Sequence, residues 1–422
     1  MKISFSPPDI NEDDITAVSE TLRSGWITSG TRVVEFENEL TKWCGTSRVA
    51  ALNSATAALT CILEILGIGP GDEVITSAYT YTASASVIMH VGATPVLVDC
   101  LPDGYSIDPA AVAAAVTSRT KAVIPVDIGG VPVDYDALRA ALNVPAVFRY
   151  YAPRVGTMQE LFSRLPIIAD SAHAFGATYK GSPIGSVADF TAFSFHAVKN
   201  LTTAEGGALT WRNDLAAHGD VAGLRGEALD EEIYRMIKLY SLHGQDKDAL
   251  AKTQGGWEYD IIAPLYKCNL TDIAAALGLS QLGRYEQALA RRRELVALYT
   301  EQLGAVAAAG GFELEVLDHG GRDSDDFDSS RHLMMVRLLG RDDDFRRRFI
   351  TTMAEQEVAC NVHFKPLPIL SAYQAFGFDI SDYPNAWTRY ENEVTLPLHT
   401  LLSDEDVKFV CECFARAYQA CL

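Results

Sequence analysis

The 422-residue sequence lacks both a disulfide-type cysteine pattern and long apolar runs. Its eight cysteines are scattered and form no CxxC pair, so we expect a reducing compartment and no metal site. No uninterrupted apolar run is long enough to cross a bilayer, and the first residues, MKISFSPPDI, lack the apolar core of a signal peptide. These absences predict a soluble cytoplasmic protein with no membrane partner.

Positive charge is also scarce. The sequence has 35 lysines and arginines against 55 aspartates and glutamates, which gives a formal net charge of −20. A nucleic-acid-binding surface usually needs a basic patch, so we expect no nucleic-acid partner. A small anionic substrate can still bind, because local cations and backbone dipoles decide such binding.

The length and a hydrophobic fraction of 48% predict two or three subdomains around a large core. In the first half, strand-like and helical stretches alternate, which is typical of a parallel sheet with crossover helices. We predict strands over 73–77, 95–99, 122–126 and 165–169, and helices over 7–24, 57–66, 82–91, 108–117 and 134–142. Residues 143–164 form an insertion that this pattern leaves unassigned.

The second half of the chain predicts a smaller α+β lobe. A regular element from Thr271 to about Leu303 is predicted as one long helix that joins two lobes. Further predicted elements are helices over 213–224 and 342–356, strands over 332–339, 358–364 and 394–398, and a C-terminal helix from residue 404. We therefore divide the chain into an N-terminal segment (1–25), a large α/β domain (26–285) and a small C-terminal domain (286–422).

Residues 188–211, ADFTAFSFHAVKNLTTAEGGALTW, place one lysine between two strand-like runs. Aromatic and β-branched residues favour strands over 189–196 and 207–211, and the polar centre favours a tight turn that carries Lys199. A lysine removed from water has a lowered pKa and becomes a usable nucleophile, as Schiff-base chemistry requires. A solvated loop lysine is the alternative, but Ser194, His196 and Asn200 surround this lysine with polar groups.

Two further polar stretches follow predicted strands. Residues 53–56, Asn-Ser-Ala-Thr, precede a helix, and free N–H groups at a helix start form an anion site. An ordinary N-cap is the alternative there. Asp170 ends the apolar run LPIIA, where it either caps a turn or pairs with a protonated heteroaromatic nitrogen. Ligands of parallel sheets bind at such strand ends, where Tyr79, Tyr81 and Asp127 also fall.

Seven motifs, taken in order, make the sequence resemble the DegT/DnrJ/EryC1/StrS aminotransferases. They are GWITSG (25–30), NSATAAL (53–59), GIGPGDEV (67–74), ADSAHA (169–174), FSFHAVKN (193–200), EGG (205–207) and NLTDIAAALG (269–278). The resemblance implies a pyridoxal-phosphate enzyme of fold type I. Such an enzyme has a large domain with a mostly parallel sheet flanked by helices, and a smaller C-terminal α+β domain. It also implies a homodimer with shared active sites.

The resemblance implies a role for each matching polar residue. Lys199 would form the Schiff base with pyridoxal 5'-phosphate and move the proton, and Asp170 would keep the pyridine nitrogen protonated. His173 would lie near the ring and its phenolic oxygen. Tyr81 would stack on the ring, with Tyr79 as the alternative. The cofactor phosphate would be bound by a group of small residues: Ser54, Ala55, Thr56 and Ser194.

One implied contact crosses to the second subunit. Asn269 would reach the neighbouring subunit's phosphate, with Lys267 as the competing candidate. Both stay open because residues 266–270 read YKCNL where the family commonly has Tyr-Asn-Tyr-Arg-Met.

The predicted reaction is a two-step transamination with pyridoxamine 5'-phosphate as the intermediate form of the cofactor. An amino acid, with L-glutamate expected, would donate the amino group to a keto-sugar, most simply a nucleotide-linked 4-keto or 3-keto deoxysugar. Candidate substrate contacts are His363, Lys365 and Arg225, or residues 149–154.

Three alternatives to that reaction remain. The first is a cyclitol (inosose-type) or aromatic-precursor aminotransferase. The second is a sugar dehydratase, which carries histidine at the lysine position, so Lys199 argues against it. The third is a cofactor-binding regulator without turnover.

Overall fold

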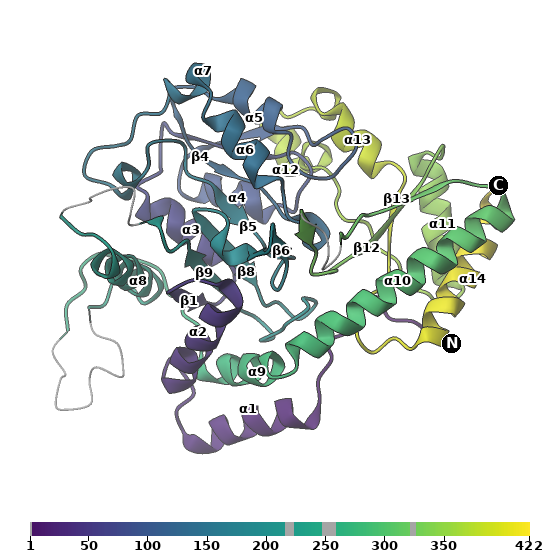
Figure 1. Cartoon of the computed structure of the whole chain (residues 1–422), viewed down its shortest axis with the longest axis horizontal. Helices are drawn as coiled ribbons and strands as arrows, with labels where there is room; N and C mark the ends of the chain where they lie inside the picture. Colours follow the sequence, from purple (N-terminus) through teal and green to yellow (C-terminus); the bar gives the residue numbers. More distant parts are fainter. Residues whose placement is uncertain (1, 216–222, 247–258, 321–325) are drawn as a thin grey trace.

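The computed structural model describes residues 2–215, 223–246, 259–320 and 326–422. It has two lobes joined by a long helix, α10 (Tyr285–Gly310). This helix runs from the central sheet to the lobe that contains the C-terminal helix, α14 (Asp404–Cys421) (Figure 1). None of the helices in these ranges is long and apolar enough to cross a membrane.

The larger lobe is built on one seven-stranded sheet. Its order is β3 (Thr94–Val98), β2 (Glu73–Ser77), β4 (Thr120–Ile124), β5 (Ile168–Asp170), β8 (Phe190–Ser194), β9 (Gly207–Trp211) and β1 (Val49–Leu52). Two parallel bridges, Val123 to Ile167 and Val126 to Asp170, join β4 to β5. All neighbours run parallel except β9, which is antiparallel to both β8 and β1.

Helices cover both faces of this sheet, as its nearly continuous apolar strands require. One face packs against α2 (Thr31–Cys44), α5 (Pro109–Ala115), α6 (Tyr135–Leu142) and α9 (Asp272–Leu282). The other face packs against α3 (Ala55–Ile65), α4 (Ala83–His90) and α8 (Glu227–Ser241). The carboxyl ends of the parallel strands are thereby left as the open edge of the larger lobe.

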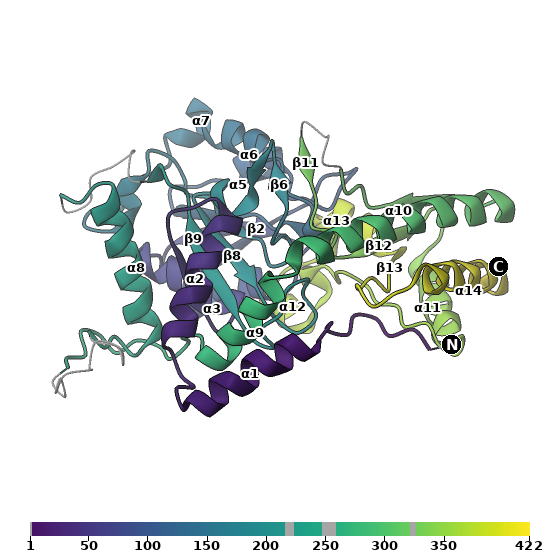
Figure 2. The same cartoon turned by 60° about the horizontal axis from the view of Figure 1, so that its bottom comes forward.

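The first helix begins later than predicted. Helix α1 (Glu12–Ser24) starts after Asn11, whose side chain forms a capping box with Asp14. Pro7 and Pro8 lie outside the helix, in the segment that leads into it. Figure 2 shows α1 lying along α9, on the opposite side of the larger lobe from α7 (Pro145–Phe148).

The single long helix predicted from residue 271 is wrong, because the structure has α9 and α10 with a break at residues 283–284. Arg284 leaves the helical conformation, with φ −124° and ψ 12°. Its guanidinium donates hydrogen bonds to the backbone oxygen of Asp9 and to the carboxylate of Asp14. The break therefore orients Arg284 toward the buried carboxylate of α1.

The smaller lobe contains an antiparallel sheet of β10 (Leu314–Val316), β12 (Met334–Leu338) and β13 (Glu393–Leu396), packed against α10, α11 (Asp343–Glu355) and α14. The strand predicted over 358–364 is wrong. Only isolated bridges occur there, at Val358 and Asn361. The N–H of His363 donates instead to the side chain of Glu393, at 2.9 Å, so no further ladder hydrogen bond forms.

Two segments without a predicted strand, 213–241 and 143–164, contain short or unpredicted helices. Most of the helix predicted over 213–224 lies outside the described residues, and α8 was not predicted although its buried apolar residues follow helical spacing. The unassigned insertion 143–164 contains α7 and a 3-10 turn (Met158–Leu161), and it packs on the core under α3. The division into three domains stays a prediction.

Candidate active site

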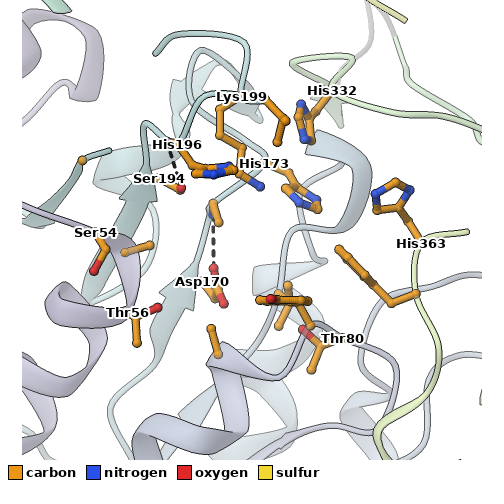
Figure 3. A pocket seen from close by; sticks show the side chains of 18 of the residues that line it. Ser54, Thr56, Thr80, Asp170, His173, Ser194, His196, Lys199, His332 and His363 are labelled. Carbon is orange, nitrogen blue, oxygen red and sulfur yellow. Dashed lines mark hydrogen bonds between the residues drawn. The ribbon is translucent and has the colours of Figure 1, made fainter. Parts of the chain in front are cut away.

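A cavity of about 380 Å³ opens at the carboxyl ends of β5 and β8 (Figure 3). Many of its lining residues were predicted as site residues: Ser54, Ala55, Thr56, Tyr81, Asp170, His173, Ser194, Lys199 and His363. They come from five separate stretches of sequence. The cavity is therefore a property of the folded sheet and of both lobes, because His363 follows α11.

Lys199 lies in the turn between β8 and β9. The antiparallel pairing of Ser194 with Gly207 closes this turn, and the N–H of Lys199 donates to the backbone oxygen of His196 at 2.9 Å. Burial lowers the pKa of Lys199 to about 8, and the opposing carboxylate of Asp170 raises it. Because burial lowers the pKa of its amine, Lys199 is suited to nucleophilic and proton-transfer chemistry.

Asp170 ends β5, the strand next to β8, and its carboxylate is buried. Its Oδ2 accepts a hydrogen bond from the Ser84 hydroxyl at 2.7 Å, and its Oδ1 accepts one from the N–H of Ala172 at 3.2 Å. Burial raises the pKa of Asp170, whereas these two hydrogen bonds and the charge of Lys199 lower it. The arrangement holds the Asp170 side chain inside the cavity, and its hydrogen bonds and the charge of Lys199 partly offset the effect of burial.

The start of α3 forms another wall of the cavity. Ser54 is the N-cap, and its hydroxyl accepts a hydrogen bond from the N–H of Ala57 at 3.0 Å. The N–H groups of Ala55 and Thr56 have no carbonyl four residues earlier within the helix, so they can bind an anion. Gly207 allows this helix start to approach β9, since a Cβ there would lie 2.3 Å from the carbonyl carbon of Ser54.

Two neighbouring imidazoles, His173 and His332, line the side of the cavity near Lys199, with ring centroids 4.4 Å apart and the ring planes tilted by 44°. Burial holds the pKa of each well below its usual value, so both rings are neutral. The Nδ1 of His173 accepts a hydrogen bond from the N–H of Gly129 at 3.2 Å, which leaves its Nε2 as a donor.

His332 has the tautomer opposite to that of His173. The amide nitrogen of Asn200 donates to the backbone oxygen of Ser330, so its amide oxygen faces the Nδ1 of His332 at 2.9 Å. That Nδ1 is therefore the protonated nitrogen, and Nε2 of His332 is an acceptor. The two histidines thus offer the cavity one hydrogen-bond donor and one acceptor.

His363 lines the cavity on the side opposite to α3 (Figure 3). Burial, with a smaller effect from Lys199, lowers its pKa to about 4. Its Nδ1 lies 3.0 Å from the hydroxyl of Thr395, and the ring of Phe5 stacks on it with centroids 5.6 Å apart. The ring is therefore fixed in orientation, and Nε2 is the nitrogen left for a ligand.

The two candidate tyrosines differ in position. Tyr81 lines the cavity, stays mostly exposed, and lies 5.8 Å from the ring of Phe364 at a tilt of 45°. Tyr79 is fully buried, and its hydroxyl donates to the backbone oxygen of His363 at 2.7 Å. Of the two, only Tyr81 is available to a ring bound in the cavity.

Four predicted site residues do not line this cavity. Lys365 is exposed just beyond Phe364, and Arg225 is exposed between the end of β9 and α8. Lys267 is exposed as well, and Asn269 donates from Nδ2 to the hydroxyl of Ser29 at 2.5 Å. The structure therefore leaves open their predicted contacts with substrate or with a second subunit.

The residues of the site that were not predicted include Ser84, His332 and Phe364. Ser84 falls in the first turn of a predicted helix, and a serine there has no local feature that indicates contact with Asp170. His332 heads a predicted strand, far from Lys199 in the sequence. Phe364 follows the predicted His363 directly, so proximity could have suggested it.

These residues fit pyridoxal 5'-phosphate. The unpaired N–H groups at the start of α3 suit a phosphate, and a buried carboxylate, Asp170, suits a protonated ring nitrogen. A desolvated amine, Lys199, suits the aldehyde, and Tyr81 and His173 provide ring surfaces. Each functional group of the cofactor has a chemically matching partner in one cavity.

Comparison with known proteins agrees with this site. The model of the DegT/DnrJ/EryC1/StrS aminotransferase family matches residues 8–144 and 162–415. The residues between the two matched ranges, 145–161, fall within the insertion that the sequence pattern left unassigned. The family match thus extends over both lobes and includes the whole cavity.

Individual relatives are similar along their full length. The structure resembles that of the putative sugar aminotransferase Spr1654 from Streptococcus pneumoniae, solved in PLP and PMP forms. The PLP form has 46% identity, a TM-score of 0.90 and 100% coverage of both chains. The spore coat polysaccharide biosynthesis protein SpsC of Bacillus subtilis is 37% identical over 97% of this chain and 95% of that protein. UDP-4-amino-4-deoxy-L-arabinose–oxoglutarate aminotransferase of Shewanella sediminis is 33% identical over 96% and 95%, respectively.

The comparisons confirm the predicted family, the fold type I architecture and pyridoxal 5'-phosphate as the cofactor. The chain therefore belongs to the DegT/DnrJ/EryC1/StrS aminotransferase family, whose sugar aminotransferases are pyridoxal-phosphate-dependent transaminases.

Proposed function

We propose that this enzyme transfers the amino group of L-glutamate to the keto group of a nucleotide-linked deoxysugar, giving an amino-sugar. The observation that carries the proposal is the pairing of a desolvated amine, Lys199, with a buried carboxylate, Asp170, in one cavity. The names of the relatives support the acceptor class, since one acts on a UDP-linked amino-sugar and another serves polysaccharide synthesis.

In this proposal each cavity residue holds one part of the cofactor. The N–H groups of Ala55 and Thr56 hold the phosphate, and the hydroxyl of Ser194 lies in the same cavity to assist them. Asp170 holds the ring nitrogen, and Tyr81 covers the ring. Pyridoxal 5'-phosphate, when bound, supplies an electron-withdrawing ring that stabilises the negative charge left on a carbon when its proton is removed.

Lys199 is proposed to move the proton. With a pKa of about 8, a substantial fraction of its amine is neutral in mildly alkaline solution. The neutral Nζ accepts a proton from the substrate carbon and returns it at the neighbouring position, so one base serves both half-reactions. The neutral His173 offers its Nε2 proton as a hydrogen bond to an oxygen in the cavity.

Recognition of the nucleotide part is proposed to occur outside the cavity. Within the described residues, Lys199 is the only lysine or arginine that lines the cavity. The phosphates of a nucleotide need cations, so the proposed contact is the exposed Lys365, next to the cavity residue Phe364. Arg225 stays a second candidate for this contact.

We also propose a homodimer. Large exposed apolar side chains occur on α1 and the residues beside it, and on residues 259–266: Ile10, Ile15, Leu22, Trp26, Ile27, Tyr259, Ile261, Ile262 and Tyr266. Exposed apolar patches of this kind mark association surfaces. Lys267 and Asn269 border the second group, which supports their predicted contact with the neighbouring subunit's cofactor.

The reaction is tested by separating its two halves. Glutamate alone added to the purified enzyme should change the cofactor absorbance and release 2-oxoglutarate, and Lys199→Ala should abolish the release of 2-oxoglutarate. A panel of nucleotide-linked keto-sugars and free cyclitols, scored by mass, then identifies the acceptor. Unchanged absorbance with glutamate would argue for another donor or for a regulator, and loss of water without amination would identify a dehydratase.

The shared site is tested by complementation. If Asn269 serves the neighbouring subunit, mixing Lys199→Ala with Asn269→Ala subunits should restore activity that each variant lacks alone. The same experiment with Lys267→Ala in place of Asn269→Ala shows whether Lys267 is the residue that serves the neighbouring subunit. If the activity of the mixture is only the sum of the activities of the two separate variants, the shared site is contradicted.

A further inference from the structure

A chain of hydrogen bonds leads from the cavity to a fully buried carboxylate. The Nδ1 of His363 lies 3.0 Å from Oγ1 of Thr395, and that oxygen lies 2.5 Å from Oε1 of Glu393. The other oxygen of Glu393 accepts a hydrogen bond from the backbone N–H of His363 at 2.9 Å. Thr395 and Glu393 are two residues apart on β13, so both face the same side of the strand. Only His363 of the three lines the cavity.

The single hydroxyl proton of Thr395 makes the chain directional. When Glu393 is ionised, the hydroxyl donates to Glu393 and accepts from His363, whose proton is then on Nδ1. When Glu393 is protonated, every bond reverses, and the proton of His363 moves to Nε2. In both states the imidazole is neutral, and only the role of its cavity nitrogen changes from acceptor to donor.

The surrounding groups favour proton storage on Glu393 rather than on the ring. Burial raises the pKa of Glu393 to about 8, and the nearby Arg346 opposes this shift. Burial and the charge of Lys199 lower the pKa of His363 to about 4. The other titratable groups coupled to Glu393, which are Tyr79, Tyr105 and Cys360, have pKa values raised by burial and stay uncharged near neutrality.

We propose that Glu393, Thr395 and His363 form a proton relay that exchanges a proton with the sugar substrate at the Nε2 of His363. The inference rests on the proposed function. A substrate O–H or N–H gives its proton to Nε2 while the Nδ1 proton passes to Thr395 and the hydroxyl proton passes to Glu393. The carboxylate becomes an acid, and the imidazole is neutral before and after.

The reverse transfer delivers one proton from Nε2. It protonates the substrate oxygen that leaves as water when an amine condenses with the ketone, and Glu393 becomes ionised again. The relay thereby gives the cavity an acid and a base in addition to Lys199. In the glutamate half, release of the 2-oxo acid adds water to a C=N bond, which is the reverse of this condensation, so the relay can supply the same proton transfers there.

The test compares Thr395→Val, which keeps the shape but breaks the relay, with Thr395→Ser, which keeps the hydroxyl. We expect Thr395→Val to slow the keto-sugar half-reaction by about 100-fold, in the range of general acid–base effects. Thr395→Ser should stay near the wild type, and any slowing of the glutamate half-reaction by Thr395→Val should fall on the step that releases the 2-oxo acid. Thr191→Val, at a buried hydroxyl of β8 without a hydrogen-bond partner, is the matched control.

A second readout needs neither cofactor nor turnover. In ¹⁵N-histidine-labelled apoprotein, His363 should change from the Nε2–H to the Nδ1–H tautomer as the pH rises through about 8, the pKa of Glu393. The signal is identified by its loss in His363→Gln, and the change should vanish in Glu393→Gln.

A tautomer that does not respond to pH, or Thr395→Val with a wild-type sugar half-reaction, would overturn the relay. If glutamate fails to react in every variant, the proposed function fails instead, and the tautomer measurement still decides on the relay.

Discussion

Ser84 donates a hydrogen bond of 2.7 Å from its hydroxyl to the Oδ2 of Asp170. Both side chains are buried, and Ser84 lies in the first turn of α4, one layer away from the strand that carries Asp170. The bond fixes the orientation of the carboxylate and lowers its pKa against the opposing effect of burial. A helix on one face of the sheet thus controls a carboxylate at the sheet edge.

We predict that Ser84→Ala weakens pyridoxal-phosphate binding by about tenfold, the value of one hydrogen bond to a charged group. Without the serine, the pKa of Asp170 rises further and its carboxylate is less fixed. The measurement is a fluorescence titration of apoenzyme with the cofactor. Ser86→Ala on the same helix, where the hydroxyl donates only to the backbone oxygen of Ala83, should leave the affinity unchanged.

Replacing Asp170 with Asn should make Lys199 more acidic. The carboxylate raises the pKa of the lysine, so its removal should move the titration midpoint below about 8. An amine-reactive reagent applied to the apoprotein over a pH series, with the Lys199 peptide quantified by mass spectrometry, measures the midpoint. Lys42, exposed on α2 and paired with Glu39, provides the internal control. An unshifted midpoint would show that Asp170 does not act on Lys199 electrostatically.

Glu393 should make stability depend on pH. Its pKa is raised from 4.5 to about 8, so its stabilising contribution is complete below pH 4.5 and is lost as the pH rises through 8. Glu393→Gln lacks this ionisation. The melting temperature of the wild type relative to the variant should therefore fall as the pH rises from 4.5 to about 8 and stay level above that. A difference in melting temperature between the wild type and Glu393→Gln that is the same at every pH would contradict the raised pKa of Glu393.

The insertion is predicted to stabilise the fold through Gln159. This side chain is fully buried, and it donates to the backbone oxygen of Leu66 at 2.9 Å and accepts the N–H of Arg154 at 3.0 Å. Gln159→Leu leaves both backbone groups unpaired and should cost about 2 kcal/mol in a urea denaturation. Val155→Ala, at a side chain 87% exposed, should change stability by less than about 0.5 kcal/mol.

The bounds of a strand can be predicted from the sequence where the signals that begin and end it are local. Strands β2 and β9 have the predicted bounds, because each is an apolar run between clear turn signals. The structure also places Lys199 and Asp170 in one cavity, as expected from their positions after neighbouring parallel strands. Neighbouring strands of parallel sheets bring their carboxyl ends together, so this proximity follows from topology.

Long-range partners were not predictable in the same way. The link between Thr395 and His363 depends on two segments that only the folded smaller lobe brings together. The break between α9 and α10 depends on Arg284 finding Asp14, which lies 270 residues away in the sequence. In each case the local sequence favours a regular element, and a distant polar partner decides the outcome.

The connection between β5 and β8 has a consequence for how acceptor preference can diversify. Asp170 ends β5 and Lys199 lies in the turn after β8, the hydrogen-bonded neighbour of β5, whereas His332 and His363 enter the cavity from segments that follow α10. Substitutions in the second pair can change which keto compound is accepted while the sheet keeps the reacting amine and its counter-charge in register. Laboratory evolution toward new amino-sugars should therefore accumulate changes beyond residue 310 and leave the strand ends intact.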